Sequence, residues 1–149
     1  SKRFKTYPGT KIQPKLKLAV CIDISGSISD KEYEIFLNEI FAIAKHTGEV
    51  EVVEWDTKVQ GTYKIKGYKP NITRLGSGGT CPKDAIKWVN DRKNKFDGCV
   101  FFTDGYFYHD EVDDKFRIPA MFVITADGST NACKKYRTIK LPKTESDAA

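Results

Sequence analysis

The sequence predicts a three-layer α/β/α fold around a mainly parallel central sheet with one antiparallel edge strand. Strand-like apolar segments alternate with amphipathic helical segments along the 149 residues, as they do in folds with parallel sheets. Three of these strand segments are almost continuously apolar, which is typical of strands buried on both faces. Two neighbouring strand segments are joined by a short turn, and this predicts a hairpin at one edge of the sheet.

The expected elements follow from periodicity and from helix start and stop signals. In chain order they are a strand over 16–24, a helix over 29–48, strands over 49–55 and 58–65, a helix from Pro82 to about Lys93, and strands over 98–105, 118–125 and 138–141. The helix over 29–48 has the clearest signals, because Ser29 and Glu32 form a capping-box pattern and Gly48 follows its last turn.

The composition indicates one globular domain, expected over 14–141. A basic arm or linker over 1–13 is expected before it, and a flexible tail over 142–149 after it. Residues 1–17 carry six basic groups and no acid, which suits either a solvated linker or contact with nucleic acid. The linker is favoured because no nucleic-acid-binding motif accompanies the arm.

The cysteines favour a reducing compartment. None of the four is spaced as CxxC, and neither histidine lies near such a pair, so a structural zinc site is not expected. Cys21 and Cys99 lie inside apolar strand segments, where a free thiol acts as a small hydrophobic group. No signal peptide and no apolar run of roughly 18 residues is visible. We therefore expect reduced cysteines and a cytoplasmic protein without a membrane partner.

Carboxylate and hydroxyl side chains follow the predicted buried strands. Asp23, Ser25 and Ser27 lie at the end of the first strand, Thr80 lies in a glycine-rich loop, and Asp104 lies at the end of a later strand. Binding sites of open α/β sheets form at the carboxyl ends of the strands, so these side chains should converge. All five are hard oxygen donors, which suit Mg²⁺ or Mn²⁺. The sequence thus predicts a metal site, although an Asx turn alone would also explain the first three residues.

The order Asp23-x-Ser25-x-Ser27, then Thr80, then Asp104 resembles the metal-ion-dependent adhesion site (MIDAS) of von Willebrand factor A (VWA) domains. The resemblance implies a VWA-like, Rossmann-type sheet. It also implies that Ser25 and Ser27 bind the metal directly and that Asp23 and Asp104 bind it directly or through water. Thr80 would bind directly in one state and through water in another.

A closer resemblance is to the VWA-like domain found C-terminal to predicted metallopeptidase-type proteins of bacteria and phages. The segments DISGSIS, GGT and FFTDGY carry it, together with the pair Trp55-Asp56, and it covers roughly residues 14–141. That subfamily commonly has Asp after GGT, where this chain has Cys81. The five ligand positions do not include this residue, so the site is expected to persist.

The resemblance implies a non-catalytic binding module in which Mg²⁺ holds an acidic side chain of a partner protein, with Mn²⁺ or Ca²⁺ as alternatives. It further implies an upstream metallopeptidase-like domain, which would hold any peptidase activity, and a MoxR-type AAA+ ATPase as a partner. No HExxH motif occurs in this chain. The aromatic run Tyr106-Phe107-Tyr108 could either form a recognition patch beside the metal or pack under its loop.

Two other functions are compatible with parts of the sequence. One is nucleic-acid binding through the basic arm. The other is a Mg²⁺-dependent phosphatase resembling the haloacid dehalogenases, but those enzymes need a second Asp two residues after the first, where this chain has Ser25. His109 is expected to be a surface loop residue rather than a sixth ligand or a base.

Overall fold

The computed structural model describes residues 16–65 and 78–143. Six strands form a single sheet in the order β3-β2-β1-β4-β5-β6. The strands are β1 (Leu18–Asp23), β2 (Val50–Trp55), β3 (Val59–Ile65), β4 (Gly98–Thr103), β5 (Ala120–Ile124) and β6 (Arg137–Lys140). The helices are α1 (Asp30–Thr47) and α2 (Lys83–Asn90), with short 3₁₀ helices η1 (His109–Glu111) and η2 (Asn131–Cys133). The predicted arm over 1–13, and residues 144–149 of the predicted tail, lie outside the described residues.

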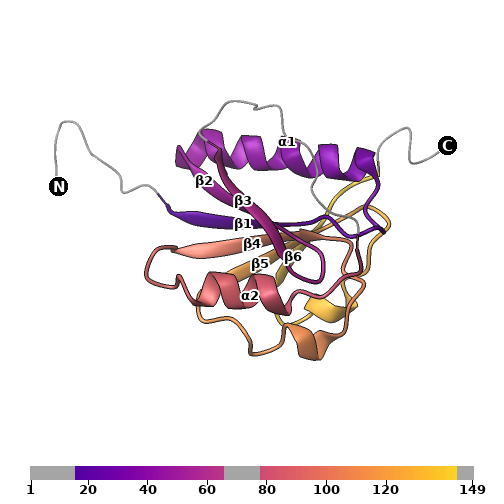
Figure 1. Ribbon diagram of the computed structural model, residues 1–149. Helices are drawn as coiled ribbons and strands as arrows, with labels where there is room; N and C mark the ends of the chain where they lie inside the picture. The colour runs from indigo at the N-terminus through magenta and orange to yellow at the C-terminus, as the bar shows by residue number, and fades with distance from the viewer. Residues whose placement is uncertain (1–15, 66–77, 144–149) are drawn as a thin grey trace, which may run out of the picture.

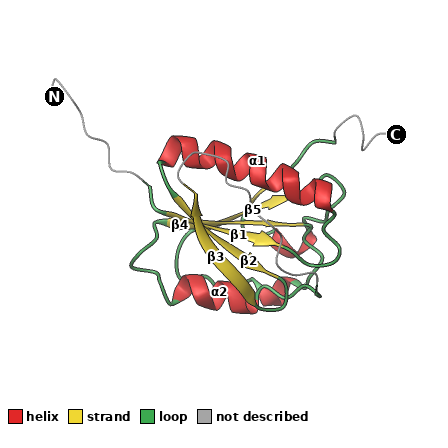
Figure 2. Cartoon of the chain, turned by 45° about the horizontal axis from the view of Figure 1, so that its top comes forward, coloured by secondary structure: helices red, strands yellow, loops and turns green. Residues whose placement is uncertain are grey.

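The sheet confirms the predicted fold class. β2, β1, β4, β5 and β6 pair in parallel, while β3 pairs antiparallel with β2 at one edge. Helices α1 and α2 cover opposite faces of the sheet (Figures 1 and 2). The carboxyl ends of the five parallel strands therefore meet at a single edge, which we call the carboxyl edge.

Two apolar cores, one on each face, hold the layers together. Alternate residues of β1 serve the two sides, since Val20 and Ile22 pack into the core under α1, while Ala19 and Cys21 pack into the core over α2. Because β1 is buried on both faces, it shows the nearly continuous apolar run from which its central position was predicted. The middle of the sheet thus forms a rigid base for the loops at the carboxyl edge.

Helix α1 forms where its end signals predict. The Ser29 side chain accepts a hydrogen bond from the Glu32 backbone N–H at 3.1 Å, and the Glu32 carboxylate accepts one from the Ser29 N–H at 3.0 Å. Gly48 ends the helix at φ 92°, a conformation that glycine adopts without a steric cost. The N-cap Ser29 lies two residues after Ser27, so the capping box fixes the end of the β1–α1 loop that leads into the helix.

Three details differ from the sequence prediction. Helix α2 ends at Asn90 rather than near Lys93, because the following N–H groups bond three residues back and the chain continues in tighter turns. The helices η1 and η2 were not predicted, as they are single turns without an amphipathic pattern. The burial of Glu54 in β2 was also not predicted. Glu54 is fully buried and accepts hydrogen bonds from the hydroxyls of Tyr33 and Tyr63.

Among the described residues, no helix has both the length and the hydropathy required to cross a lipid bilayer.

Candidate metal site

The predicted ligands gather at the carboxyl edge, where the strand order reverses. Strands β2 and β4 are the two neighbours of β1 in the sheet. Helix α1 connects β1 to β2, and helix α2, on the opposite face of the sheet, precedes β4 in the chain. The crevice outside the ends of β1 and β4 is therefore a topological switch point, the usual place for a binding site in an open α/β sheet. Asp23 is the last residue of β1, and Asp104 follows directly on β4.

Asp23 lies at the base of this crevice with no exposed surface. One carboxylate oxygen accepts a hydrogen bond from the Ser25 N–H at 2.8 Å, and the other accepts one from the Thr103 hydroxyl at 2.6 Å. Burial raises the pKa of Asp23 to about 6, although the hydrogen bonds from Ser25 and Thr103 act in the opposite direction, and the Asp104 charge adds a smaller rise. The Asx turn considered for this loop is therefore present, and it holds the carboxylate in place.

Three further predicted ligands form a continuous chain of oxygens above Asp23. The hydroxyls of Ser25 and Ser27 are 3.1 Å apart, and the Ser27 hydroxyl donates to the Asp104 carboxylate at 2.6 Å. The other oxygen of that carboxylate accepts from the Tyr106 N–H at 3.2 Å. Ser25 and Asp104 are buried, whereas Ser27 is exposed. The structure thus brings together residues that are up to 79 positions apart (104 − 25) in the sequence.

Thr80 reaches the same region on the segment before α2. The backbone N–H of Gly26 donates to the Gly78 carbonyl at 2.8 Å, which joins this segment to the loop after β1. Thr80 itself is half-buried. The fifth predicted ligand therefore lies on a segment that is bonded to the loop carrying Ser25 and Ser27.

Asp56 fixes this segment, a role that the sequence analysis did not assign. Its carboxylate accepts hydrogen bonds from the N–H groups of Thr57, Lys58 and Gly78 and from the Gln60 side chain, and its backbone carbonyl accepts from the Cys81 N–H at 2.8 Å. Burial raises the pKa of Asp56, but these four hydrogen bonds outweigh that effect and hold it below its usual value.

Gly78 is required where this segment meets Asp56. A Cβ atom at this position would lie 2.9 Å from a carboxylate oxygen of Asp56, closer than real side chains approach. The pair Trp55-Asp56 was the available sequence signal for this contact.

The donor set fits a small divalent cation. Within residues 16–65 and 78–143, no ion pair involves Asp23 or Asp104, although both carboxylates are buried. Burying two carboxylates without a counter-charge costs free energy, and a bound cation would reduce this cost. The two carboxylates and the three nearby hydroxyl-bearing residues could bind such a cation through oxygen. In the same part of the chain no group of three or more His, Cys, Asp or Glu side chains is placed to hold a metal ion, so any ion here would depend on the hydroxyl oxygens as well as on the two carboxylates.

Of the other reactive side chains, His109 is on the surface and three of the four cysteines are in the core. The His109 side chain is 73% exposed, and its ring lies 3.0 Å from Asp113, as expected for a surface residue. All four cysteines are free. Burial raises the pKa of Cys99 and of Cys133 to about 12 and raises the pKa of Cys21, so these thiols are packing groups.

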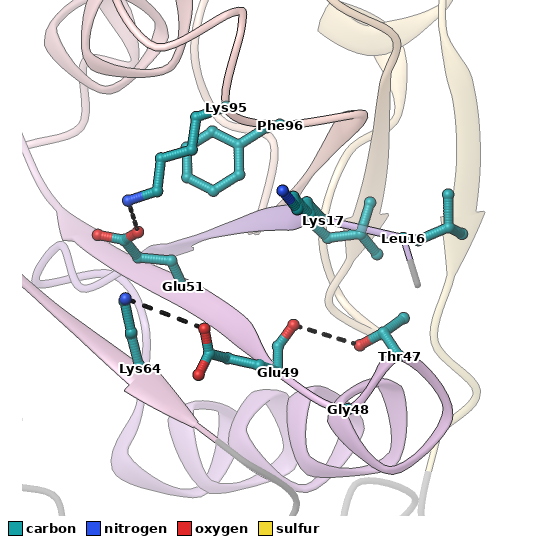
Figure 3. A pocket seen from close by; sticks show the side chains of 10 residues that line it. Leu16, Lys17, Thr47, Gly48, Glu49, Glu51, Lys64, Lys95 and Phe96 are labelled. Carbon is teal, nitrogen blue, oxygen red and sulfur yellow. Dashed lines mark hydrogen bonds and ion pairs between the residues drawn. The ribbon is translucent and has the colours of Figure 1, made fainter. Parts of the chain in front are cut away.

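A separate cavity of about 460 Å³ lies at the opposite edge of the sheet (Figure 3). Ion pairs cross its mouth, with Lys95 2.7 Å from Glu51 and Lys64 3.9 Å from Glu49. Both glutamates that line this cavity therefore have a lysine partner, unlike Asp23 and Asp104 among the described residues.

Comparison with solved structures supports the fold. The structure of proximal thread matrix protein 1 from the mussel byssus aligns with a TM-score of 0.57 over 85% of this chain and 41% of that chain, at 16% sequence identity. An uncharacterised protein of Thermotoga maritima is 31% identical over 108 residues, which are 71% of this chain. The match spans only 27% of the length of that relative.

A family model described as a VWA-like domain (DUF2201) matches residues 18–139, from the start of β1 almost to the end of β6. The match includes all five oxygen-bearing residues of the carboxyl edge. The chain belongs to this family of VWA-like domains.

Proposed function

We propose that this domain is a non-catalytic, metal-dependent protein-interaction module with a MIDAS-type site at the carboxyl edge. The observation that carries the proposal is the chain of oxygens from Ser25 through Ser27 to Asp104 at a switch point of the sheet. Among the residues that the structure describes, neither Asp23 nor Asp104 forms an ion pair. Membership of a VWA-like family is consistent with an interaction role.

Mg²⁺ would be held mainly by neutral hydroxyls. Ser25, Ser27 and Asp104 form the chain of oxygens, and Thr80 lies on the segment that is bonded to their loop. Asp23 would act from behind them, since both its oxygens already accept hydrogen bonds. A bound ion would supply a Lewis-acidic position that accepts a carboxylate oxygen from an Asp or Glu of the partner. Mn²⁺ and Ca²⁺ would use the same oxygens.

The position of Asp23 also favours binding over catalysis. A nucleophilic carboxylate must present a free oxygen to its substrate. Asp23 has no exposed surface, and its two oxygens are engaged by the Ser25 N–H and the Thr103 hydroxyl. A phosphatase-like reaction at Asp23 is therefore a poorer fit than recognition of a carboxylate.

The domain is proposed to act as part of a larger assembly in the cytoplasm. The Thermotoga maritima relative extends well beyond the matched region, since the match covers 27% of it. We propose that its partners include a neighbouring metallopeptidase-like domain and a MoxR-type AAA+ ATPase. The partner group is an exposed acidic side chain.

The test is thermal unfolding of the protein in EDTA and in excess Mg²⁺. A ligand that binds only the folded state raises Tm by mass action. Ser27→Ala removes one hydroxyl from an exposed position, so the variant should fold and lose most of the Mg²⁺-dependent rise. Thr62→Ala removes a hydroxyl from an exposed position of β3 and is the matched control.

Two results would overturn the proposal. One is a wild-type protein whose Tm is the same in EDTA, Mg²⁺ and Mn²⁺. The other is a Mg²⁺-dependent rise that Ser27→Ala retains in full.

A further inference from the structure

Two exposed tyrosines stand beside the candidate metal site. Tyr106 and Tyr108 are 60% and 80% exposed, and they follow Asp104 by two and four residues. Between them Phe107 turns inward and packs against Phe122 of β5, with ring centroids 6.4 Å apart. The sequence left open whether this run is a surface patch or part of the core. The structure shows that both tyrosines are on the surface and that Phe107 anchors them.

The tyrosine at position 106 is held in place despite its exposure. Its hydroxyl donates a hydrogen bond to the backbone carbonyl of Asp127 at 2.8 Å, so the side chain bridges from the loop after β4 to the loop after β5. The Tyr108 N–H donates to the Glu111 carboxylate at 2.9 Å, which fixes the backbone at the start of η1. An aromatic surface that is already ordered loses little entropy when a partner binds.

A hollow of about 480 Å³ lies against these tyrosines. It is lined by residues 105–108 on one side and by Ser129, Asn131 and Ala132 on the other. None of these side chains is charged. This distinguishes the hollow from the cavity in Figure 3, which carries two ion pairs. The uncharged lining suits an uncharged side chain, because a buried charge would find no partner there.

Asp104 connects the oxygen cluster to two residues that line the hollow, Gly105 and Ser129. Its carboxylate accepts from the Ser27 hydroxyl at 2.6 Å, while its backbone carbonyl accepts from the Ser129 N–H at 2.8 Å. Gly105 comes next, at φ 78°, and a Cβ atom there would lie 1.9 Å from the Ser129 carbonyl oxygen. The two backbones are therefore in direct contact, and the wall is preformed.

We propose that the hollow and the two tyrosines bind an apolar side chain that lies close in sequence to the carboxylate held by the metal. The partner would then be a protein segment that carries an Asp or Glu with an aliphatic or aromatic residue a few positions away. This inference rests on the proposed function, because the metal places the carboxylate. Tyrosine suits such a contact, since it offers a large, rigid aromatic surface and a polar tip.

The test uses a displayed library of peptides in which a central Asp is fixed and the four positions on each side are random. The wild-type protein is expected to select, in Mg²⁺ but not in EDTA, peptides with an apolar residue at a constant offset from the Asp. Tyr108→Ala should weaken binding of a selected peptide about tenfold or more, as at interface hot spots. Ile139→Ala, which truncates an exposed side chain on β6, is the matched control and should not weaken it.

The Mg²⁺-dependent rise in Tm is measured on every variant, so that loss of the peptide contact is separated from loss of the metal. Selected peptides with Asp but no apolar preference would overturn the inference, as would a Tyr108→Ala variant that binds as well as the wild type. A protein that responds to Mg²⁺ but selects no peptide would also overturn it while leaving the metal site standing. A protein without any metal response would overturn both proposals.

Discussion

Replacing Asp23 with Asn should stabilise the metal-free protein. The carboxylate has no exposed surface and no ion pair among the described residues, so its negative charge is a cost of the folded state at neutral pH. Asn has the same shape. Its carbonyl can accept from the Ser25 N–H, and its amide can donate to the Thr103 hydroxyl, so hydrogen bonds with these two groups can still form.

The size of the effect follows from the pKa of Asp23. Its rise from the usual 3.8 to about 6 corresponds to about 3 kcal/mol, at about 1.4 kcal/mol per pKa unit. Because the pKa is higher in the folded state, this contribution to stability is fully present below the usual value of 3.8 and is lost as the pH rises through about 6. Asp23→Asn should therefore raise the free energy of unfolding by about 1 to 3 kcal/mol at about pH 8.

Urea unfolding in EDTA, at about pH 8 and again at about pH 4, measures this difference. The advantage of Asp23→Asn should shrink at the lower pH, where the wild-type carboxyl takes up a proton in the folded state. A variant that is less stable than the wild type by more than about 1 kcal/mol at about pH 8 would refute the reasoning, because it would mean that the folded protein compensates the charge.

Three further predictions follow from the same contacts. The Mg²⁺-dependent rise in Tm should diminish as the pH falls through about 6, because protonation of Asp23 removes a negative charge that attracts the ion. A response that is constant down to about pH 4.5 would contradict this. Asp56→Asn should lower the free energy of unfolding, measured in urea, by about 1 to 3 kcal/mol. It should also weaken the Mg²⁺-dependent rise in Tm, because it loosens the segment that carries Thr80. An unchanged rise in Tm would show that this segment does not contribute to the site. Tyr33→Phe should lower the free energy of unfolding by about 1.5 to 3 kcal/mol in the same assay, because it removes a hydrogen bond to the buried Glu54 carboxylate. A decrease of less than about 0.5 kcal/mol would show that other donors replace the Tyr33 hydroxyl.

Local signals were sufficient to predict most of the fold. The capping box of Ser29 and Glu32 and the terminal Gly48 place α1 within one residue of its observed bounds. The buried apolar runs identified β1 and β4 as central strands. Parallel pairing then fixed the common edge at which these strands end. The end of α2 was less predictable, because the choice between α-helical and 3₁₀ bonding after Asn90 depends on small differences in local geometry.

The candidate site was predictable at its ligands but not at the groups that hold them. Asp23, Ser25 and Asp104 follow buried strands and carry oxygen donors, so their convergence follows from topology. The roles of Thr103 and Asp56 depend on contacts across the fold. Thr103 bonds to a carboxylate 80 residues earlier in the chain, and Asp56 bonds to a backbone group 22 residues later. Sequence spacing alone does not predict such pairs.

The aromatic run after Asp104 shows a second limit. Tyr106, Phe107 and Tyr108 are similar residues in a loop, where no periodicity tells which face each of them takes. The directions in which these three side chains point follow from the close contact between the loops after β4 and β5, where the Asp104 carbonyl accepts a hydrogen bond from the Ser129 N–H. A contact of this kind is a property of the folded chain, and it separates the two exposed tyrosine rings from the partly buried Phe107 ring.

The most direct test of the central claim is a titration of the protein with Mn²⁺, in which electron paramagnetic resonance measures the free ion. We expect saturable binding of one Mn²⁺ per chain and displacement of Mn²⁺ by Mg²⁺. This binding should be lost in the Ser25→Ala/Ser27→Ala variant, which removes two adjacent hydroxyls of the oxygen chain. Absence of saturable binding by the wild type, or equal binding by the double variant, would contradict the assignment of a metal site to the carboxyl edge.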